Sequence, residues 1–201
     1  MATEHPKHAE TEFPVHRLIA TRWSPYVFDP QPIETAQLRA CLEAARWSPS
    51  SYNEQPWSFL VASRTDPACF ETMLGCLVEF NQNWARNAGA LLVAVAATTA
   101  EATGKPHPSA YYEVGLAVAH LAFQATEFGL AVHQMGGFDR QRTRAAYEIP
   151  EAFDPITAIA IGHPGDPASA VDAAFAARDQ ATRERKPQDE FVFSGRWGKP
   201  W

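Results

Sequence analysis

Residues 49–57 read PSSYNEQPW, a polar stretch that separates two apolar segments of different periodicity. Apolar residues upstream recur at helical spacing and predict a helix over residues 34–47, whereas residues 57–62 have the apolar character of a short strand. Pro49 ends the helix, and Pro56 keeps the residue before it out of the helical region. The stretch is therefore a helix-to-strand turn, and it is either an ordinary surface loop or a segment whose serines and asparagine face a ligand.

The rest of the chain mixes helices and strands without the strict spacing of parallel βαβ units. The predicted fold class is α+β, with a central, mostly antiparallel sheet flanked by helices. A flexible tail of residues 1–13 precedes a single domain, residues 14–201, which includes a C-terminal arm of about residues 188–201. Further helices are expected over residues 14–18, 109–129 and 140–147 and from Pro67 and Asp172, and further strands over residues 88–97 and 156–161.

The predicted helix over residues 109–129 is apolar on nearly every side. Ser109 can cap its start, and Gly129 can end it. Small residues such as Gly115 and Ala119 let another helix approach closely. Because a helix without a polar face must be covered on every side, we expect it in the centre of the fold and at a dimer interface.

The composition excludes several classes of partner. The chain has 201 residues, of which 46% are apolar and 20% charged, and its net charge of -6 argues against nucleic acid or an anionic membrane as the main partner. No apolar run approaches the ~20 residues that span a bilayer. The three cysteines form no CxxC pair and no metal-ligand spacing, so we expect free thiols, a cytoplasmic protein and no metal site.

Familiar reaction centres are missing from the sequence. It contains no GxGxxG after a strand, no Walker loop, no GxSxG, no HExxH and no Tyr-x-x-x-Lys. We therefore expect no catalytic side chain. A site in which a cofactor performs the chemistry, while the protein binds and orients it, fits this absence.

Four segments together resemble the FMN-dependent nitroreductase family, over about residues 16–201. The resemblance implies an α+β fold, an intertwined homodimer with an exchanged C-terminal tail, and FMN bound across the dimer interface. In chain order the segments are TRWSPYVF at 21–28, PSSYNEQPW at 49–57, QMGGFD at 134–139, and RERKP at 183–187 followed by the terminal RWGKPW.

An acidic protein that binds the phosphate of FMN needs a local cluster of basic groups, with arginine forks suited to the anion. By resemblance, Arg22 and Ser24 match the family's Arg-x-Ser near the phosphate, and Arg183 and Arg185 match its basic pair. The alternative for residues 183–186 is an ordinary solvated run of charges.

For the flavin ring, the resemblance implies polar contacts from one subunit and Asn81 from the other, with Asn83 as the alternative if the register shifts by two residues. Gly136 and Gly137 let backbone N–H groups approach the ring, although a strand-ending turn explains the pair as well. The other predicted cofactor-binding residues are Trp23, Tyr26, Pro49, Ser50, Ser51, Asn53, Gln134 and Met135.

Two positions depart from the family pattern. Tyr26 and Trp84 stand where many relatives carry basic residues, which leaves the redox potential and the substrate range open. Trp84 and Tyr112 are the residues predicted for the substrate pocket.

The function implied by the resemblance is that of an FMN-dependent oxidoreductase. It would take hydride from NADPH or NADH and reduce nitroaromatics, quinones or similar electron-poor acceptors by a ping-pong mechanism. Two alternatives stay open: a flavin- or nucleotide-binding protein for sensing or storage without turnover, and a flavin-fragmenting or dehalogenating member of the same fold.

Overall fold

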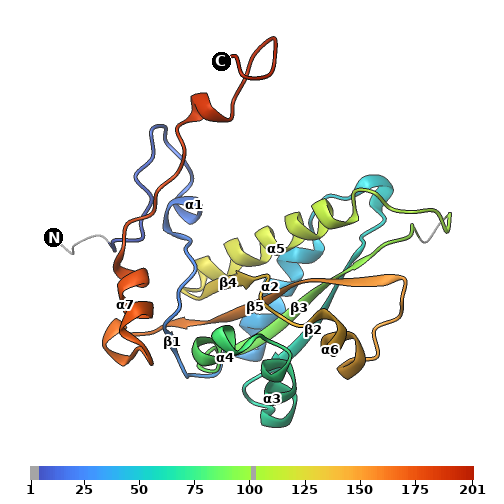
Figure 1. Cartoon of the computed structure of the whole chain (residues 1–201), viewed down its shortest axis with the longest axis vertical. Coiled ribbons are helices and arrows are strands. Elements are labelled where there is room, and N and C mark those ends of the chain that lie inside the picture. The colour runs from blue at the N-terminus through green and yellow to red at the C-terminus, as the bar shows by residue number, and fades with distance from the viewer. Residues whose placement is uncertain (1–4, 101–102) are drawn as a thin grey trace.

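The computed structural model describes residues 5–100 and 103–201 as one α+β unit (Figure 1). Seven α-helices and five strands occur within these residues, and a short 3-10 turn, η1 (Ser51–Asn53), lies in the PSSYNEQPW stretch. The helices are α1 (Arg17–Thr21), α2 (Thr35–Arg46), α3 (Pro67–Gly75), α4 (Glu79–Ala85), α5 (Ala110–Glu127), α6 (Arg140–Ala146) and α7 (Ala173–Gln180). The strands are β1 (Phe28–Asp29), β2 (Trp57–Ser63), β3 (Ala90–Ala97), β4 (Ala131–Met135) and β5 (Phe153–Pro164).

The long strand β5 organises the sheet. One of its edges pairs with β3, which in turn pairs with β2. Its other edge pairs with β4, and its last residues pair with β1. Every one of these pairings is antiparallel, so the predicted α+β class with an antiparallel sheet is confirmed.

Helices cover both faces of the sheet because β3 is apolar at every position. Successive side chains of a strand point to opposite faces. Leu92 and Ala94 pack with α2 and α5 in one core, whereas Leu91 and Val93 pack with α3 and α4 in the other. The sheet is therefore the middle of three layers, with α2 and α5 on one side and α3 and α4 on the other (Figure 1).

Helix α5 is covered on one side only within a single chain. Val114, Val118 and Leu121 are buried against the sheet, but Gly115 and Tyr112 remain exposed. The buried side agrees with a place in the centre of the fold, and the dimer interface expected for the outer side stays a prediction.

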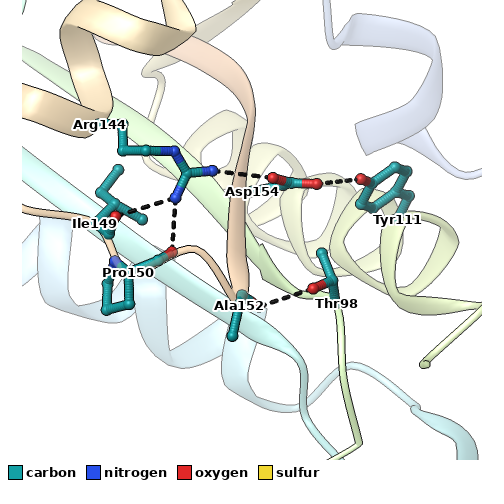
Figure 2. A network of polar contacts seen from close by, with 7 residues as sticks. All are labelled: Thr98, Tyr111, Arg144, Ile149, Pro150, Ala152 and Asp154. Carbon is teal, nitrogen blue, oxygen red and sulfur yellow. Dashed lines mark hydrogen bonds and ion pairs between the residues drawn. The ribbon is translucent and has the colours of Figure 1, made fainter. Parts of the chain in front are cut away.

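The first turn of α5 is tied to the sheet by a polar network (Figure 2). The Tyr111 hydroxyl donates a 2.5 Å hydrogen bond to Asp154, which also accepts one of 3.0 Å from Arg144. Arg144 donates further to the carbonyl oxygens of Ile149 and Pro150. The bond to Asp154 raises the pKa of Tyr111. The network fixes the end of α5 that starts at Ser109.

Two local expectations need correction, and one helix, α4, was not predicted. The short helix predicted over residues 14–18 lies at Arg17–Thr21. Ser109 stands at the N-cap of α5, but its hydroxyl makes no cap hydrogen bond; it donates to Glu113 over 2.8 Å. Gly129, with φ +72°, follows the helix as expected.

The C-terminal segment after α7 runs beside the N-terminal segment and α1, and its end projects away from the sheet (Figure 1). The Trp201 N–H donates to the Val192 carbonyl, and the Ser194 N–H donates to the Lys199 carbonyl, so the end of the chain folds back on itself. Trp197 and Trp201 are nevertheless 91% and 86% exposed. Within the described residues, no helix has the length and apolar character needed to cross a membrane.

Candidate functional site

An arginine cluster joins the two ends of the chain. Arg183 donates hydrogen bonds to the carbonyl oxygens of Ala20 and Arg22, so the tail is fastened to the end of α1. Burial, followed by the charges of Arg22 and Arg185, lowers the pKa of Arg183. Burial and the charge of Arg185 lower the pKa of Arg22 in the same way. Arg183 is half-buried at this point, whereas Glu184, Arg185 and Lys186 are exposed.

The cluster borders a cavity of about 420 Å³ between the N-terminal segment and the tail. Arg22, Arg183, Arg185 and Lys186 line it, and so do Glu10 and Glu12. Among the ion pairs in the described part of the chain, none involves Arg22, Arg183 or Arg185. The Arg183 Nε is also buried without a hydrogen-bond partner. Crowded guanidinium groups of this kind favour an anion with several oxygen atoms.

Two residues that the sequence did not single out, Asp179 and His133, hold the Arg-x-Ser loop by hydrogen bonds to its main chain. Arg22 donates a 3.2 Å hydrogen bond to Ser24. The buried Asp179 carboxylate accepts the N–H groups of Tyr26 and Val27 at 2.9–3.0 Å. Burial raises the pKa of Asp179, and these N–H donors oppose the rise.

The second of these residues is His133, in β4. Its Nδ1 lies 2.7 Å from the Pro25 carbonyl oxygen and must donate the proton to it. Burial lowers the pKa of His133, which keeps the ring neutral. Since Gly136 follows β4 directly, His133 connects the Arg-x-Ser loop to the glycine turn.

Tyr26 and Trp84 belong to an aromatic cluster. The Tyr26 ring stacks on Phe175 at 5.3 Å and meets the edges of Trp84 and His133. Trp84 is 1% exposed in the core, so this side chain does not line an open substrate pocket in the chain, contrary to the prediction. Large aromatic rings from α4, α7 and the β1 region fill one apolar space, which explains why Trp84 turns inward.

The glycine turn and Asn81 are brought together. The Asn81 amide donates a 2.8 Å hydrogen bond to the Gly137 carbonyl, and its oxygen accepts one of 3.2 Å from Trp84. A Cβ at Gly137 would meet the Asn81 amide at 2.5 Å. A Cβ at Gly136 would meet nothing within 4 Å. The open side of this turn is therefore at Gly136.

The PSSYNEQPW turn is strained and lies at the surface. Tyr52, Asn53 and Gln55 have φ values of 51°, 59° and 48°, although none is glycine. Such conformations cost ~1–3 kcal/mol each and persist only where the surroundings enforce them. The Ser50 hydroxyl accepts the Gln55 N–H at 3.0 Å, and the Ser51 N–H donates over 3.0 Å to Glu113 in α5.

The other predicted residues lie around these groups. Tyr112 is 69% exposed on the first turn of α5. Trp23 is half-buried, and its ring packs against that of His5. Met135 is buried in the core. The exposed residues are Pro49, Asn83 and Gln134.

The two groups of predicted residues lie at opposite ends of α5. Glu113 holds the PSSYNEQPW turn at one end, and Glu127 forms a 2.7 Å ion pair with Arg17 of α1 at the other. Glu127 lies fourteen positions after Glu113, so at 1.5 Å per position the two are ~21 Å apart along the helix. Arg22 follows α1 directly, so the arginine cluster lies near the far end of α5.

Comparison with known proteins places the chain in a family. Residues 19–163 match the model of the nitroreductase family, which covers more than half of the chain. The chain belongs to the nitroreductase family.

Individual relatives agree with this assignment. A solved oxidoreductase containing FMN is 33% identical, with a TM-score of 0.88 over 94% of this chain and 96% of that one. A putative nitroreductase from Desulfovibrio desulfuricans, solved in complex with FMN, is 22% identical, with a TM-score of 0.70 over 93% of this chain and 99% of that one, and supports the fold alone. An uncharacterised 15.4 kDa protein of Mycolicibacterium smegmatis is 38% identical over 65% of this chain and 86% of its own length.

Proposed function

We propose that this chain is an FMN-dependent oxidoreductase that takes hydride from NADPH or NADH and reduces nitroaromatics, quinones or similar electron-poor acceptors. The arginine cluster carries the proposal, because Arg22, Arg183 and Arg185 gather positive charge that no described ion pair neutralises, in a fold that serves redox enzymes. The 33% identical relative that contains FMN supports the choice of cofactor.

The residues present fit FMN. Arg22 and Arg185 offer guanidinium groups to a phosphate, and Arg183 holds them close together from the tail. The space beside Gly136 admits a flat ring against the main chain. Ser50, Ser51 and Asn53 offer short polar groups for the edge of that ring. When bound, FMN supplies a ring that accepts hydride from a nicotinamide and gives the electrons to a second substrate.

In the reaction, the protein's own residues hold the two ends of the cofactor in position. Asn81 fixes the Gly137 carbonyl, so the N–H groups of the turn keep one orientation toward the ring. Asp179 and His133 fix the Arg-x-Ser loop, so the phosphate end keeps its place relative to β4. Tyr112, exposed beside the anchored first turn of α5, is the residue that we propose to border the substrate. One open face that serves both substrates in turn leads to ping-pong kinetics.

The enzyme is a homodimer in this proposal, with each site built from both chains. The PSSYNEQPW turn and the arginine cluster lie too far apart along α5 to meet on one ligand within a chain, but two antiparallel copies of α5 bring them together. The uncovered face of α5 and the exposed tail supply the contact surfaces. Aromatic residues on a projecting arm are a liability unless a partner covers them.

A spectroscopic experiment tests the function. The purified protein should carry a yellow chromophore identified as FMN, lose its colour anaerobically with NADPH or NADH, and regain it with a quinone. A bound flavin that nicotinamide does not reduce would favour the sensing or storage alternative. Release of a ring-opened flavin product, or of halide from a halogenated aromatic, would favour the flavin-fragmenting or dehalogenating alternative.

A further inference from the structure

Helix α5 carries a buried carboxylate that no step of the proposed reaction uses. The Glu113 side chain is 4% exposed, and its Oε1 accepts two hydrogen bonds, from the Ser51 N–H at 3.0 Å and from the Ser109 hydroxyl at 2.8 Å. Burying a carboxylate is costly unless it is well partnered. The position of Glu113 therefore calls for an explanation beyond packing.

The second oxygen of this carboxylate has an incomplete environment. Oε2 lies 3.3 Å from the His107 Nε2, but the angle is not that of a hydrogen bond, and neither atom has another partner. The His107 side chain is 6% exposed. The main-chain N–H of His107 donates to the Thr98 carbonyl and holds the residue in place. Hydrogen bonds therefore fix Oε1, whereas Oε2 is enclosed beside the His107 ring without a hydrogen bond.

What Glu113 holds is the strained turn. Three left-handed residues follow Ser51 within four positions, and the bonds inside the turn, such as Gln55 to Ser50, are local ones that move with it. The bond from Ser51 to Glu113 ties this turn to a long helix of the core. The Tyr111–Asp154 bond, two residues earlier in α5, keeps the first turn of the helix from shifting (Figure 2).

We propose that Glu113 is a positioning residue for the flavin ring: it fixes the Ser50–Asn53 turn in the conformation that meets the ring, with no contact to the ring itself. This inference rests on the proposed function. It also separates two roles, because Glu113 acts at the ring end of FMN whereas Arg185 acts at the phosphate end. Riboflavin, which has the ring but no phosphate, distinguishes them.

The first test is made on the protein without flavin. Amide hydrogen exchange at Ser51 should be at least tenfold faster in Glu113→Ala than in the wild type, because its acceptor is gone. Glu113→Gln keeps one oxygen acceptor and should give an intermediate rate. Glu127→Gln makes the same change on the same helix, at an exposed ion pair, and should leave the rate unchanged.

The second test uses ligand binding. Glu113→Ala should weaken both FMN and riboflavin about tenfold or more and change the visible circular dichroism of the bound ring, whereas Arg185→Ala should weaken FMN and leave riboflavin within twofold. If Glu113→Ala does not fold, Glu113→Gln decides, with an expected loss of threefold or more for both ligands against the wild type.

The outcomes separate the two proposals. A wild-type protein that binds neither FMN nor riboflavin contradicts the proposed function, while the exchange rate of Ser51 still tests the anchor. A wild-type protein that binds FMN, together with Glu113 variants whose exchange, affinity and spectrum stay within twofold of it, overturns the role of Glu113.

Discussion

The side-chain amide of Asn81 donates a 2.8 Å hydrogen bond to the main-chain oxygen of Gly137. The indole N–H of Trp84 donates to the oxygen of the same amide over 3.2 Å, so the amide cannot flip without losing both bonds. The Val78 N–H donates to the same Gly137 oxygen at 3.1 Å. The glycine turn is thus fixed from its inner side, and its outer side at Gly136 stays open.

Gly137→Ala should destabilise the protein by ~1–3 kcal/mol, because the new methyl group overlaps the Asn81 amide at 2.5 Å and Val78 at 3.1 Å. Urea unfolding followed by circular dichroism measures the loss. Gly136→Ala is the matched control, since a Cβ there has open space around it. Equal stability of the two variants would mean that the Asn81 contact does not constrain the turn.

Gly136→Val should leave the unfolding free energy close to that of the wild type while FMN binding is lost or hydride transfer is severely slowed. The side chain extends into the space that we assign to the ring. Rates per bound flavin, measured beside the stability of the same sample, separate this result from a turn that is merely weakened. Normal turnover of the folded, flavin-loaded variant would mean that the ring does not lie on this side of the turn.

Arg185→Ala should weaken FMN by about ten- to a hundredfold, equivalent to ~1.5–3 kcal/mol for a lost charge-assisted contact. The fold should survive, because Arg183 keeps the tail fastened to α1. Arg46→Ala removes the same charge from an exposed ion pair with Glu43 and serves as the control. FMN affinity is measured by fluorescence titration. An unchanged affinity would mean that the arginine cluster has a structural role and does not bind the phosphate.

His133 predicts a dependence of stability on pH. Its pKa is lowered in the folded protein by burial, so below the ordinary value of ~6.5 the unfolded chain binds the proton more readily. The contribution of His133 to stability is therefore present at pH 7 and is lost as the pH falls below ~6.5. The difference in unfolding free energy between the wild type and His133→Gln should shrink from pH 7 to pH 5. His8→Gln is the control, and a difference that stays constant over this range would contradict the assignment.

Removal of residues 188–201 should loosen the dimer and release flavin together. The deleted segment carries Trp197 and Trp201, whose exposure in one chain is the reason for assigning them to a partner. Analytical ultracentrifugation and flavin content, measured on the same preparation, check the prediction. A truncated protein that stays dimeric and fully loaded would show that the tail does not hold the site together.

Much of the fold follows from short-range patterns. Apolar periodicity, prolines and the Gly129 stop located α2, α3, α5 and the β3 strand, because each signal acts within a few residues of the chain. The arginine cluster was also predictable, since its members lie in segments whose order matches one family. Position along the sequence was enough in these cases.

The missing parts depend on contacts between distant residues. Trp84 turns inward because Tyr26 and Phe28 from one distant segment, and His133 from another, pack against its ring. Glu113 and Asp179 have ordinary sequence neighbours, and only the folded chain places Ser51 and Tyr26 beside them. The one available signal was an acidic residue inside the apolar helix after Ser109, where a carboxylate needs a partner.

The contacts of Glu113 and Glu127 make the length of α5 set the distance between the PSSYNEQPW turn and the arginine cluster. One extra residue between Glu113 and Glu127 would rotate one end by about 100° against the other and lengthen the helix by ~1.5 Å. The turn and the arginine loop would then face different directions, although each half would still be intact. Redesign of this protein therefore has to keep the residue count of this helix.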